Sequence, residues 1–154
     1  MTVHLQSSHR IVVEAPADQA FMFFTPAGEE LWVDGWQPTY VHPTDGRTEA
    51  GMVFVTGQGD EFTVWTLVDF DRVNLRSRYQ RCTPASRTGL VEVQCAALDA
   101  ERTEVRVQYT LTALNVAGQR SLRDYEGRRF AEMIDGWAKA IDERIEALRT
   151  TAIR

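Results

Sequence analysis

Apolar and polar residues alternate through much of the segment 39–115, and this period of two is typical of β-strands with one buried face. Gly, Pro, Asp and Asn interrupt the alternation at short intervals and divide the segment into candidate strands. These are Thr39–His42, Gly51–Thr56, Glu61–Asp69, Asn74–Cys82, Thr88–Ala97 and Thr103–Asn115. Because short loops join them, we expect neighbouring strands to pair in antiparallel fashion.

The residues before this segment predict one more strand and two short helices. The β-branched run Ile11-Val12-Val13 indicates a strand over His9–Glu14, which Pro16 ends. Helical periodicity follows over Ala17–Phe24, and a second short helix or turn is expected over Gly28–Val33.

The C-terminal third has the period of one long amphipathic helix, from Ser121 to about Arg149. Its apolar side carries Leu122, Phe130, Met133, Ile134, Trp137, Ile141, Ile145 and Leu148. Polar residues and glycines interrupt that side, and each glycine lowers helix stability by about 1 kcal/mol relative to Ala. We therefore expect the N-terminal half of the helix to line a pocket and the C-terminal half to anchor the fold. The pattern gives no role to Arg144.

A sheet with one solvent-exposed face and one apolar face must bury the apolar face against another element. The C-terminal helix is the element long enough to cover it. The fold class is therefore α+β: an antiparallel sheet of about seven strands, two short helices after the first strand, and one long helix across the sheet. With 154 residues and 44% hydrophobic content, we expect residues 1–154 to form a single domain.

Charge argues against nucleic acid as a partner. The chain has 17 Lys and Arg against 22 Asp and Glu, a formal net charge of −5, whereas phosphate binding depends on a concentrated basic surface. Arginines do gather at Arg72, Arg76, Arg78 and Arg81, and we interpret them as the water-facing side of a strand.

The sequence favours a cytoplasmic protein without a cofactor. No stretch has the length of a membrane span, and residues 1–8 lack the apolar region of a signal peptide, so no membrane insertion is expected. Cys82 and Cys95 are expected to be free thiols. The three histidines, His4, His9 and His42, are too scattered for a metal site, so we expect no metal.

Three segments resemble the SRPBCC or START-like superfamily, the helix-grip fold of the birch-pollen allergen, in its polyketide cyclase/dehydrase-like branch. They are Val13-Glu14-Ala15-Pro16-Ala17 leading to Phe21, Glu30-Leu31-Trp32-Val33-Asp34-Gly35-Trp36 followed by Pro38, and Tyr109-Thr110-Leu111-Thr112-Ala113-Leu114. The resemblance implies a curved sheet gripping the long helix around a deep cavity that opens near the two short helices. It implies no catalytic residues, because the superfamily has no common catalytic signature.

Aromatic residues are the strongest signal for a ligand pocket inside such a fold, because each gives a large rigid contact area. The predicted pocket residues are Trp36, Tyr40, Phe54, Trp65, Tyr79, Tyr109, Glu126, Phe130, Met133 and Trp137. Taken singly, each aromatic residue is also consistent with ordinary core packing. Trp36 is expected in a wall of the cavity, with Glu29 or Glu30 at a charged rim.

Glu126 is the candidate catalytic residue. It lies on the apolar side of the predicted helix, where a buried carboxylate with a raised pKa could act as a general acid or base. The alternative is a partly exposed pair with Arg123, worth a few tenths of a kcal/mol.

Three functions remain open at this stage. The first is binding of a small hydrophobic ligand, lipid-like, polyketide-like or aromatic, between the helix and the sheet. The second is a cyclase or dehydratase in which Glu126 works with Tyr40, Tyr79 or Tyr109. The third is a chaperone-associated interaction module. The sequence leaves both a monomer and a homodimer open.

Overall fold

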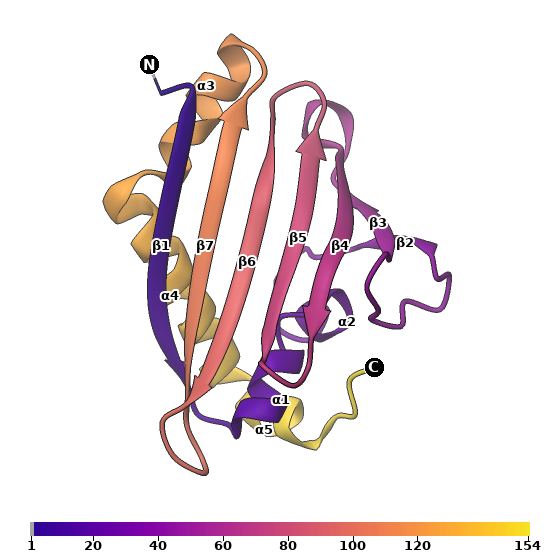
Figure 1. The fold of residues 1–154 in the computed structure, drawn as a ribbon, viewed down its shortest axis with the longest axis vertical. Helices are drawn as coiled ribbons and strands as arrows, with labels where there is room; N and C mark the ends of the chain where they lie inside the picture. Colours follow the sequence, from indigo (N-terminus) through magenta and orange to yellow (C-terminus); the bar gives the residue numbers. More distant parts are fainter. Residues whose placement is uncertain (1) are drawn as a thin grey trace.

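The computed structural model describes residues 2–154 and contains a seven-stranded sheet with the long helix packed across one face (Figure 1). Its strands are β1 (His4–Val13), β2 (Thr39–His42), β3 (Val53–Thr56), β4 (Thr63–Asp71), β5 (Arg76–Thr83), β6 (Arg87–Ala97) and β7 (Thr103–Ala113). The order across the sheet is β1-β7-β6-β5-β4-β3-β2, and every neighbouring pair is antiparallel. The first strand, β1, therefore pairs with the last, β7.

The helices fall into two groups along the chain. After β1 come α1 (Ala17–Met22) and α2 (Pro26–Glu29), which lie near the lower end of the sheet in Figure 1. After β7 come α3 (Val116–Leu122), a 3₁₀ turn η2 (Arg123–Tyr125), α4 (Gly127–Glu143) and α5 (Ile145–Thr150). A further 3₁₀ turn, η1 (Gly59–Glu61), connects β3 to β4. The predicted helix-grip architecture is confirmed.

Strand β1 begins at His4, five residues before the predicted start. Each of its residues pairs with β7, from His4 opposite Thr112 to Val13 opposite Thr103. The extra residues are mostly polar, so their apolar pattern is weak, but their backbone groups complete the ladder with β7. Ser7 also donates a hydrogen bond to the Tyr125 carbonyl oxygen at 2.7 Å, which ties the strand to η2.

The predicted helix from Ser121 to Arg149 is divided. The backbone at Glu126 is extended, with ψ of 136°, and Gly127 has φ of +51°, a conformation that favours glycine. A second break falls at Arg144, between α4 and α5. The prediction of one continuous helix was therefore wrong, although α4 alone spans 17 residues and covers the sheet.

Arg144 now has a structural role. Its Nη2 donates a hydrogen bond to Asp34 Oδ1 at 3.0 Å, and Nη1 donates to the Ala140 carbonyl oxygen at 3.4 Å. The pair joins the end of α4 to the loop after α2. Because Asp34 is exposed, the ion pair contributes little free energy and mainly fixes orientation.

Alternate residues of β5 point into the core, and Arg81 is one of them. Only 7% of Arg81 is exposed, whereas Arg76 and Arg78 face water. The interpretation that Arg81 belongs to the wet face was wrong, because it shares the strand parity of buried Tyr79.

Within residues 2–154, no helix has the length and apolar character that crossing a membrane requires.

Candidate functional site

A cavity of about 170 Å³ lies between the inner face of the sheet and α4. Strands β3 to β7 provide one side, the segment from Phe24 to Trp36 provides a second, and α4 contributes Trp137. Its lining residues are Phe24, Glu29, Val33, Trp36, Phe54, Trp65, Tyr79, Arg81, Val91, Val93, Tyr109 and Trp137. Most of these side chains are apolar or aromatic, and a few polar groups lie among them.

One wall is made of aromatic rings. Phe54 and Trp65 are directly opposite in the β3–β4 ladder, and their rings stack with centroids 5.6 Å apart. Trp36 meets both rings edge-on at 6.1 Å, and Tyr79 meets them edge-on from β5. The Trp36 ring is fixed by a hydrogen bond from Nε1 to the Pro26 carbonyl oxygen at 3.0 Å. These contacts hold a flat apolar surface that suits another ring.

Arg81 is the cationic group in the cavity wall. Its guanidinium lies 4.8 Å from the centre of the Trp65 ring, and Nη2 donates a hydrogen bond to Thr83 Oγ1 at 3.2 Å. The Nε atom is buried without a hydrogen-bond partner. A buried polar group without a partner costs free energy, so a partner from outside the chain would be stabilising.

The neighbouring strand carries another buried arginine, Arg87, whose surroundings differ. Arg87 forms two hydrogen bonds to the Glu61 carboxylate, at 3.2 and 3.4 Å, and further ones to Ser86 Oγ and the Tyr125 hydroxyl. Its charge therefore has a counterion within the chain. Among the ion pairs of residues 2–154, Arg81 has no carboxylate partner.

Glu29, at the end of α2, is the carboxyl group that lines the cavity. Its side chain is half-buried, and burial raises its pKa to about 8. The sequence suggested Glu29 or Glu30 as a rim residue. The structure separates them, because Glu30 is exposed and accepts a hydrogen bond from the Tyr40 hydroxyl at 2.9 Å.

Two tyrosines complete the polar part of the cavity. The Tyr79 hydroxyl donates to the Phe24 carbonyl oxygen at 3.1 Å. Burial raises the pKa of both Tyr79 and Tyr109, and the negative charge of Glu29 raises each further. The Arg81 cation lowers the pKa of Tyr109, and its effect is smaller than that of burial but larger than that of Glu29. Glu29, Arg81 and the tyrosines are therefore electrostatically coupled across one small space.

The structure brings together six of the ten predicted pocket residues: Trp36, Phe54, Trp65, Tyr79, Tyr109 and Trp137. Phe130 is buried against Tyr109, with ring centroids 5.2 Å apart, and Met133 is half-buried. Neither is among the residues that line the cavity.

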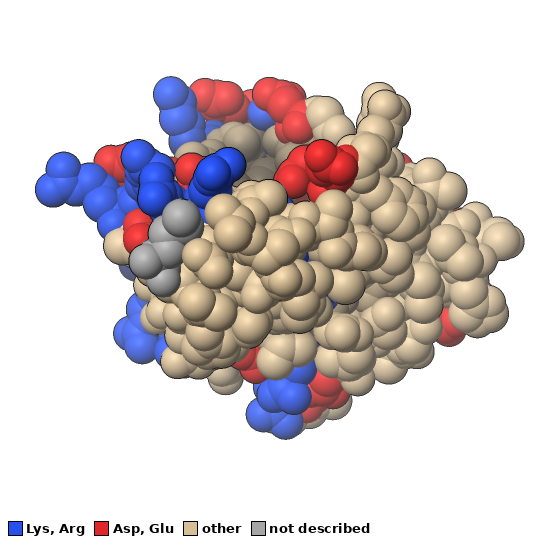
Figure 2. Space-filling view, turned by 90° about the horizontal axis from the view of Figure 1, so that it is seen from above, with Lys and Arg blue, Asp and Glu red and all other residues tan. Residues whose placement is uncertain are grey.

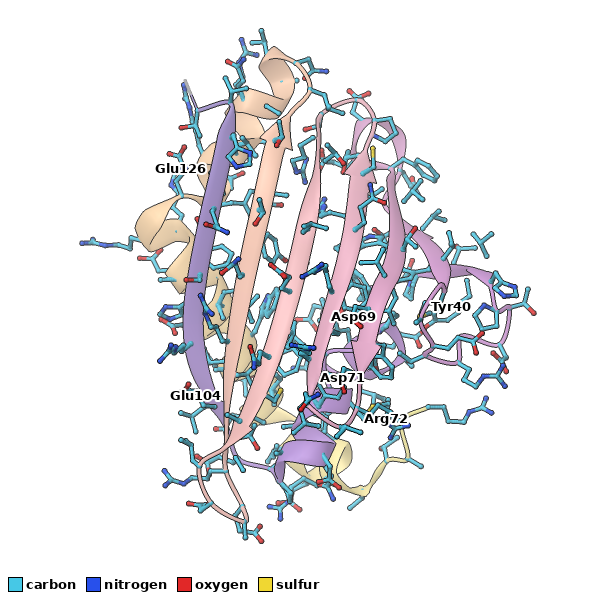
Figure 3. The ribbon with its side chains drawn as sticks, viewed as in Figure 1. Tyr40, Asp69, Asp71, Arg72, Glu104 and Glu126 are labelled. Atoms are coloured by element: carbon cyan, nitrogen blue, oxygen red, sulfur yellow. The ribbon has the colours of Figure 1, made fainter. Side chains whose placement is uncertain are left out.

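Tyr40 and Glu126 lie on opposite sides of the molecule, Tyr40 on β2 and Glu126 just before α4 (Figure 3). Glu126 is half-buried at the chain break and does not line the cavity. The predicted pairing of Glu126 with Tyr40 is therefore wrong, because β2 lies at the edge of the sheet opposite β1, and α4 packs against β1.

Sequence reasoning missed Arg81, Phe24, Val33, Val91 and Val93. Strand parity could have identified Arg81, because it lies two residues after Tyr79. Val91 and Val93 alternate in the same way on β6. Phe24 and Val33 have no such periodic signal, since they flank a short helix whose placement depends on tertiary packing.

A larger depression on the opposite, outer face of the sheet has the character of ordinary surface. Its polar lining includes Asp69, Arg76, Arg78, Glu92 and Arg106, and Figure 3 shows Asp69 on this outer face. Arg78 and Glu92 already pair at 3.1 Å. Within the described chain, no group of three or more His, Cys, Asp or Glu residues could hold a metal ion.

Viewed from the upper end of the sheet, the molecule has a hollow whose edge carries both basic and acidic side chains (Figure 2). Charged groups of both signs therefore lie along parts of this edge, whereas the lining of the cavity is mainly apolar.

Comparison with known proteins bears on the fold. No family model and no curated protein matches the sequence. Several solved structures do resemble it. Norcoclaurine synthase from Thalictrum flavum, in complex with dopamine and hydroxybenzaldehyde, has a TM-score of 0.62 and 13% identity over 92% of this chain and 88% of that chain.

Two further structures show the same likeness. An aromatase/cyclase from a Streptomyces species has a TM-score of 0.54 and 18% identity over 94% of this chain and 86% of that chain. A major latex-like protein from Panax ginseng has a TM-score of 0.64 and 9% identity over 97% of this chain and all (100%) of that chain. The resemblance stated from the sequence is thus confirmed as a shared helix-grip fold, which by itself assigns no function.

Proposed function

We propose that this protein binds a small ring-bearing ligand in the cavity beneath α4. The observation that carries the proposal is the stacked pair Phe54–Trp65 with Trp36 edge-on, which forms an aromatic wall beside unfilled space. Binding sites for small molecules are concave, mainly apolar, and carry a few polar groups that orient the ligand. Glu29, Tyr79, Arg81 and Tyr109 are the polar groups here.

The size of the cavity favours one aromatic ring over a lipid or a polyketide. An apolar cavity of about 150 Å³ is large enough to bind benzene, whereas pockets for drug-sized ligands reach about 300 to 1,000 Å³. A cavity of about 170 Å³ thus suits a single ring with a small substituent. The related structure of norcoclaurine synthase supports this class, since it is in complex with dopamine and hydroxybenzaldehyde, which are single-ring compounds.

The experiment is a titration with single-ring compounds, toluene and 4-ethylphenol, and with a long-chain fatty acid. Binding is followed by isothermal titration calorimetry and by the fluorescence of the cavity tryptophans. We expect saturable binding of the single-ring compounds and weaker binding of the fatty acid. Saturation by none of these probes would contradict the proposal.

A cavity-filling variant makes the test specific. Val91→Phe places a ring inside the cavity, and we expect it to weaken binding of 4-ethylphenol by about tenfold or more, through loss of the space and its buried contact area. Val68→Phe is the matched control, because Val68 is exposed on β4 and does not line the cavity. Equal affinities of the two variants would show that the ligand binds elsewhere.

A second candidate function is acid–base catalysis on a ring-bearing carbonyl compound, and Glu29 favours it. A half-buried carboxyl group with a pKa of about 8 can accept a proton near neutral pH. In such a reaction the Glu29 carboxylate removes a proton from the carbon next to the carbonyl, which breaks the C–H bond and forms an O–H bond. The negative charge then develops on the carbonyl oxygen, which Arg81 stabilises.

Exchange of hydrogen for deuterium at that carbon tests the catalytic candidate. We expect the protein to accelerate exchange in phenylacetone dissolved in deuterated water, measured by nuclear magnetic resonance. Glu29→Gln should remove the acceleration while leaving affinity within a few-fold. No acceleration by the wild-type protein would leave ligand binding as the function.

A further inference from the structure

We infer that the ligand is an aromatic acid, whose anionic oxygens bind the Arg81 guanidinium while its ring packs against the aromatic wall of Trp36, Phe54 and Trp65. This inference rests on the proposed function and adds the charge of the ligand to its size and shape.

Arg81 has no counterion among the described residues. Guanidinium groups stay protonated in proteins, so burial of Arg81 places a full positive charge in the cavity wall. Its contacts within the described residues are one hydroxyl group and one aromatic face. Buried charges are normally paired, and a ligand carboxylate would supply the missing pair.

Arg87 shows how the same fold pairs the charge of a buried arginine. Its guanidinium donates hydrogen bonds to the Glu61 carboxylate and the Tyr125 hydroxyl, and it too lies beside an aromatic ring. The Nε atoms of Arg87 and Arg81 are both buried without a partner, so the two arginines differ in the counterion. Arg87 is absent from the cavity lining, whereas Arg81 belongs to it. The arginine without a carboxylate partner is therefore the one that a ligand can reach.

The aromatic wall and the Arg81 cation lie side by side in the cavity. Arg81 lies 4.8 Å from the centre of the Trp65 ring, and Trp65 stacks on Phe54. A flat ring beside this wall would hold a carboxylate attached to its edge close to the guanidinium. The planar guanidinium fork matches a carboxylate with two parallel hydrogen bonds, which a lysine could not provide.

The protonation of Glu29 is consistent with an anionic ligand. The ionisable groups that line the cavity are Glu29, Tyr79, Arg81 and Tyr109. Burial keeps both tyrosines neutral, and with a pKa of about 8 Glu29 is mostly protonated at neutral pH. The cavity therefore carries a net positive charge when empty, and one anion neutralises it.

Benzoate and benzamide provide the direct test, because they share size and shape but differ in charge. At neutral pH we expect the wild-type protein to bind benzoate more tightly than benzamide by about tenfold or more, the value of a hydrogen-bonded charge pair. Arg81→Met should abolish this preference. Arg78→Met is the matched control, since Arg78 lies on the outer face of the same strand, and it should retain the preference.

The outcomes separate this inference from the proposed function. Equal affinity for benzoate and benzamide in the wild-type protein would overturn the inference while leaving ring binding in place. A preference that survives in Arg81→Met would also overturn it. If no single-ring compound of either charge binds, the proposed function itself fails. Should Arg81→Met fold poorly by circular dichroism, Arg81→Gln replaces it, with the same loss of preference expected.

Discussion

At the scale of single residues, the arginines of β5 show how much strand parity decides. Successive side chains of a strand point to opposite faces. Arg76 and Arg78 are two residues apart and both face water, whereas Arg81 is three residues after Arg78 and faces the core. The same residue type is therefore solvated at two positions and buried at the third. A group held in the core at a cost to stability is typical of a functional site.

Replacing Arg81 is expected to stabilise the empty protein. Arg81→Met keeps much of the side-chain volume and removes a buried charge that has no counterion, so the free energy of unfolding should rise by about 1 kcal/mol or more. Urea denaturation without ligand measures this change. A loss of stability would mean that the contacts with Trp65 and Thr83 outweigh the burial of the charge.

Glu29 is expected to make stability fall as pH rises. The ordinary pKa of a glutamate is 4.5, whereas that of Glu29 in the folded protein is about 8. Between pH 4.5 and about pH 8, the folded state therefore keeps a proton on Glu29 that the unfolded state has released. Stability is therefore highest below about pH 4.5, as far as this group is concerned, and declines up to about pH 8.

Glu29→Gln should remove that decline. The variant is expected to exceed the wild type by about 1 kcal/mol or more in free energy of unfolding at pH 8, and by much less under mildly acidic conditions. Urea denaturation over this pH range measures the difference. Parallel curves for the two proteins would show that Glu29 ionises normally in the folded state. Glu30→Gln, at an exposed neighbouring position, is the control.

At the scale of elements, the C-terminal segment depends on where its glycines fall. Gly127 has φ of +51° at the start of α4, whereas Gly136 lies in the middle of α4, where an added Cβ would meet open space. From the sequence, both glycines were expected to interrupt one helix. In the structure, Gly127 begins a new helix after an extended residue. Gly136 only lowers the stability of α4 through the low helix propensity of glycine.

The two glycines predict opposite mutational effects. Gly136→Ala should raise the free energy of unfolding by about 0.5 to 1 kcal/mol through helix propensity. Gly127→Ala should lower it by about 1 to 2 kcal/mol, because alanine is strained at positive φ. Thermal unfolding of both variants measures the pair. A gain in stability from Gly127→Ala would contradict the left-handed start of α4.

Element types were predictable here because periodicity and turn residues are local. Each of the six strands predicted after residue 38 has a counterpart in the sheet, as do the two short helices. The break at Glu126 was not predictable from periodicity, since Phe130, Ile134 and Ile141 keep their apolar spacing beyond it. The polar start of β1 was missed because its pairing with β7 is made by the backbone.

At the scale of the whole molecule, the resemblance predicted a cavity, and the local placement of side chains determines its size and charge. Six of the predicted aromatic residues do meet around one space, because inner-face positions of a sheet share one parity. Glu126 does not line that space, whereas Glu29 does. The position of Glu29 depends on how α2 packs over the sheet, and this packing cannot be predicted from the local sequence pattern.

The proposed small aromatic acid follows from two properties of the cavity: its volume of about 170 Å³, and Arg81 in its wall, which has no carboxylate partner among the described residues.

The most direct measurement is a crystal structure of the wild-type protein in complex with benzoate. We expect the ring to lie against Trp36, Phe54 and Trp65, with the carboxylate within hydrogen-bond distance of the Arg81 guanidinium. A ring seated there with its carboxylate directed away from Arg81 would contradict the charge assignment. An empty cavity, with benzoate elsewhere or absent at saturating concentration, would contradict the proposed function as well.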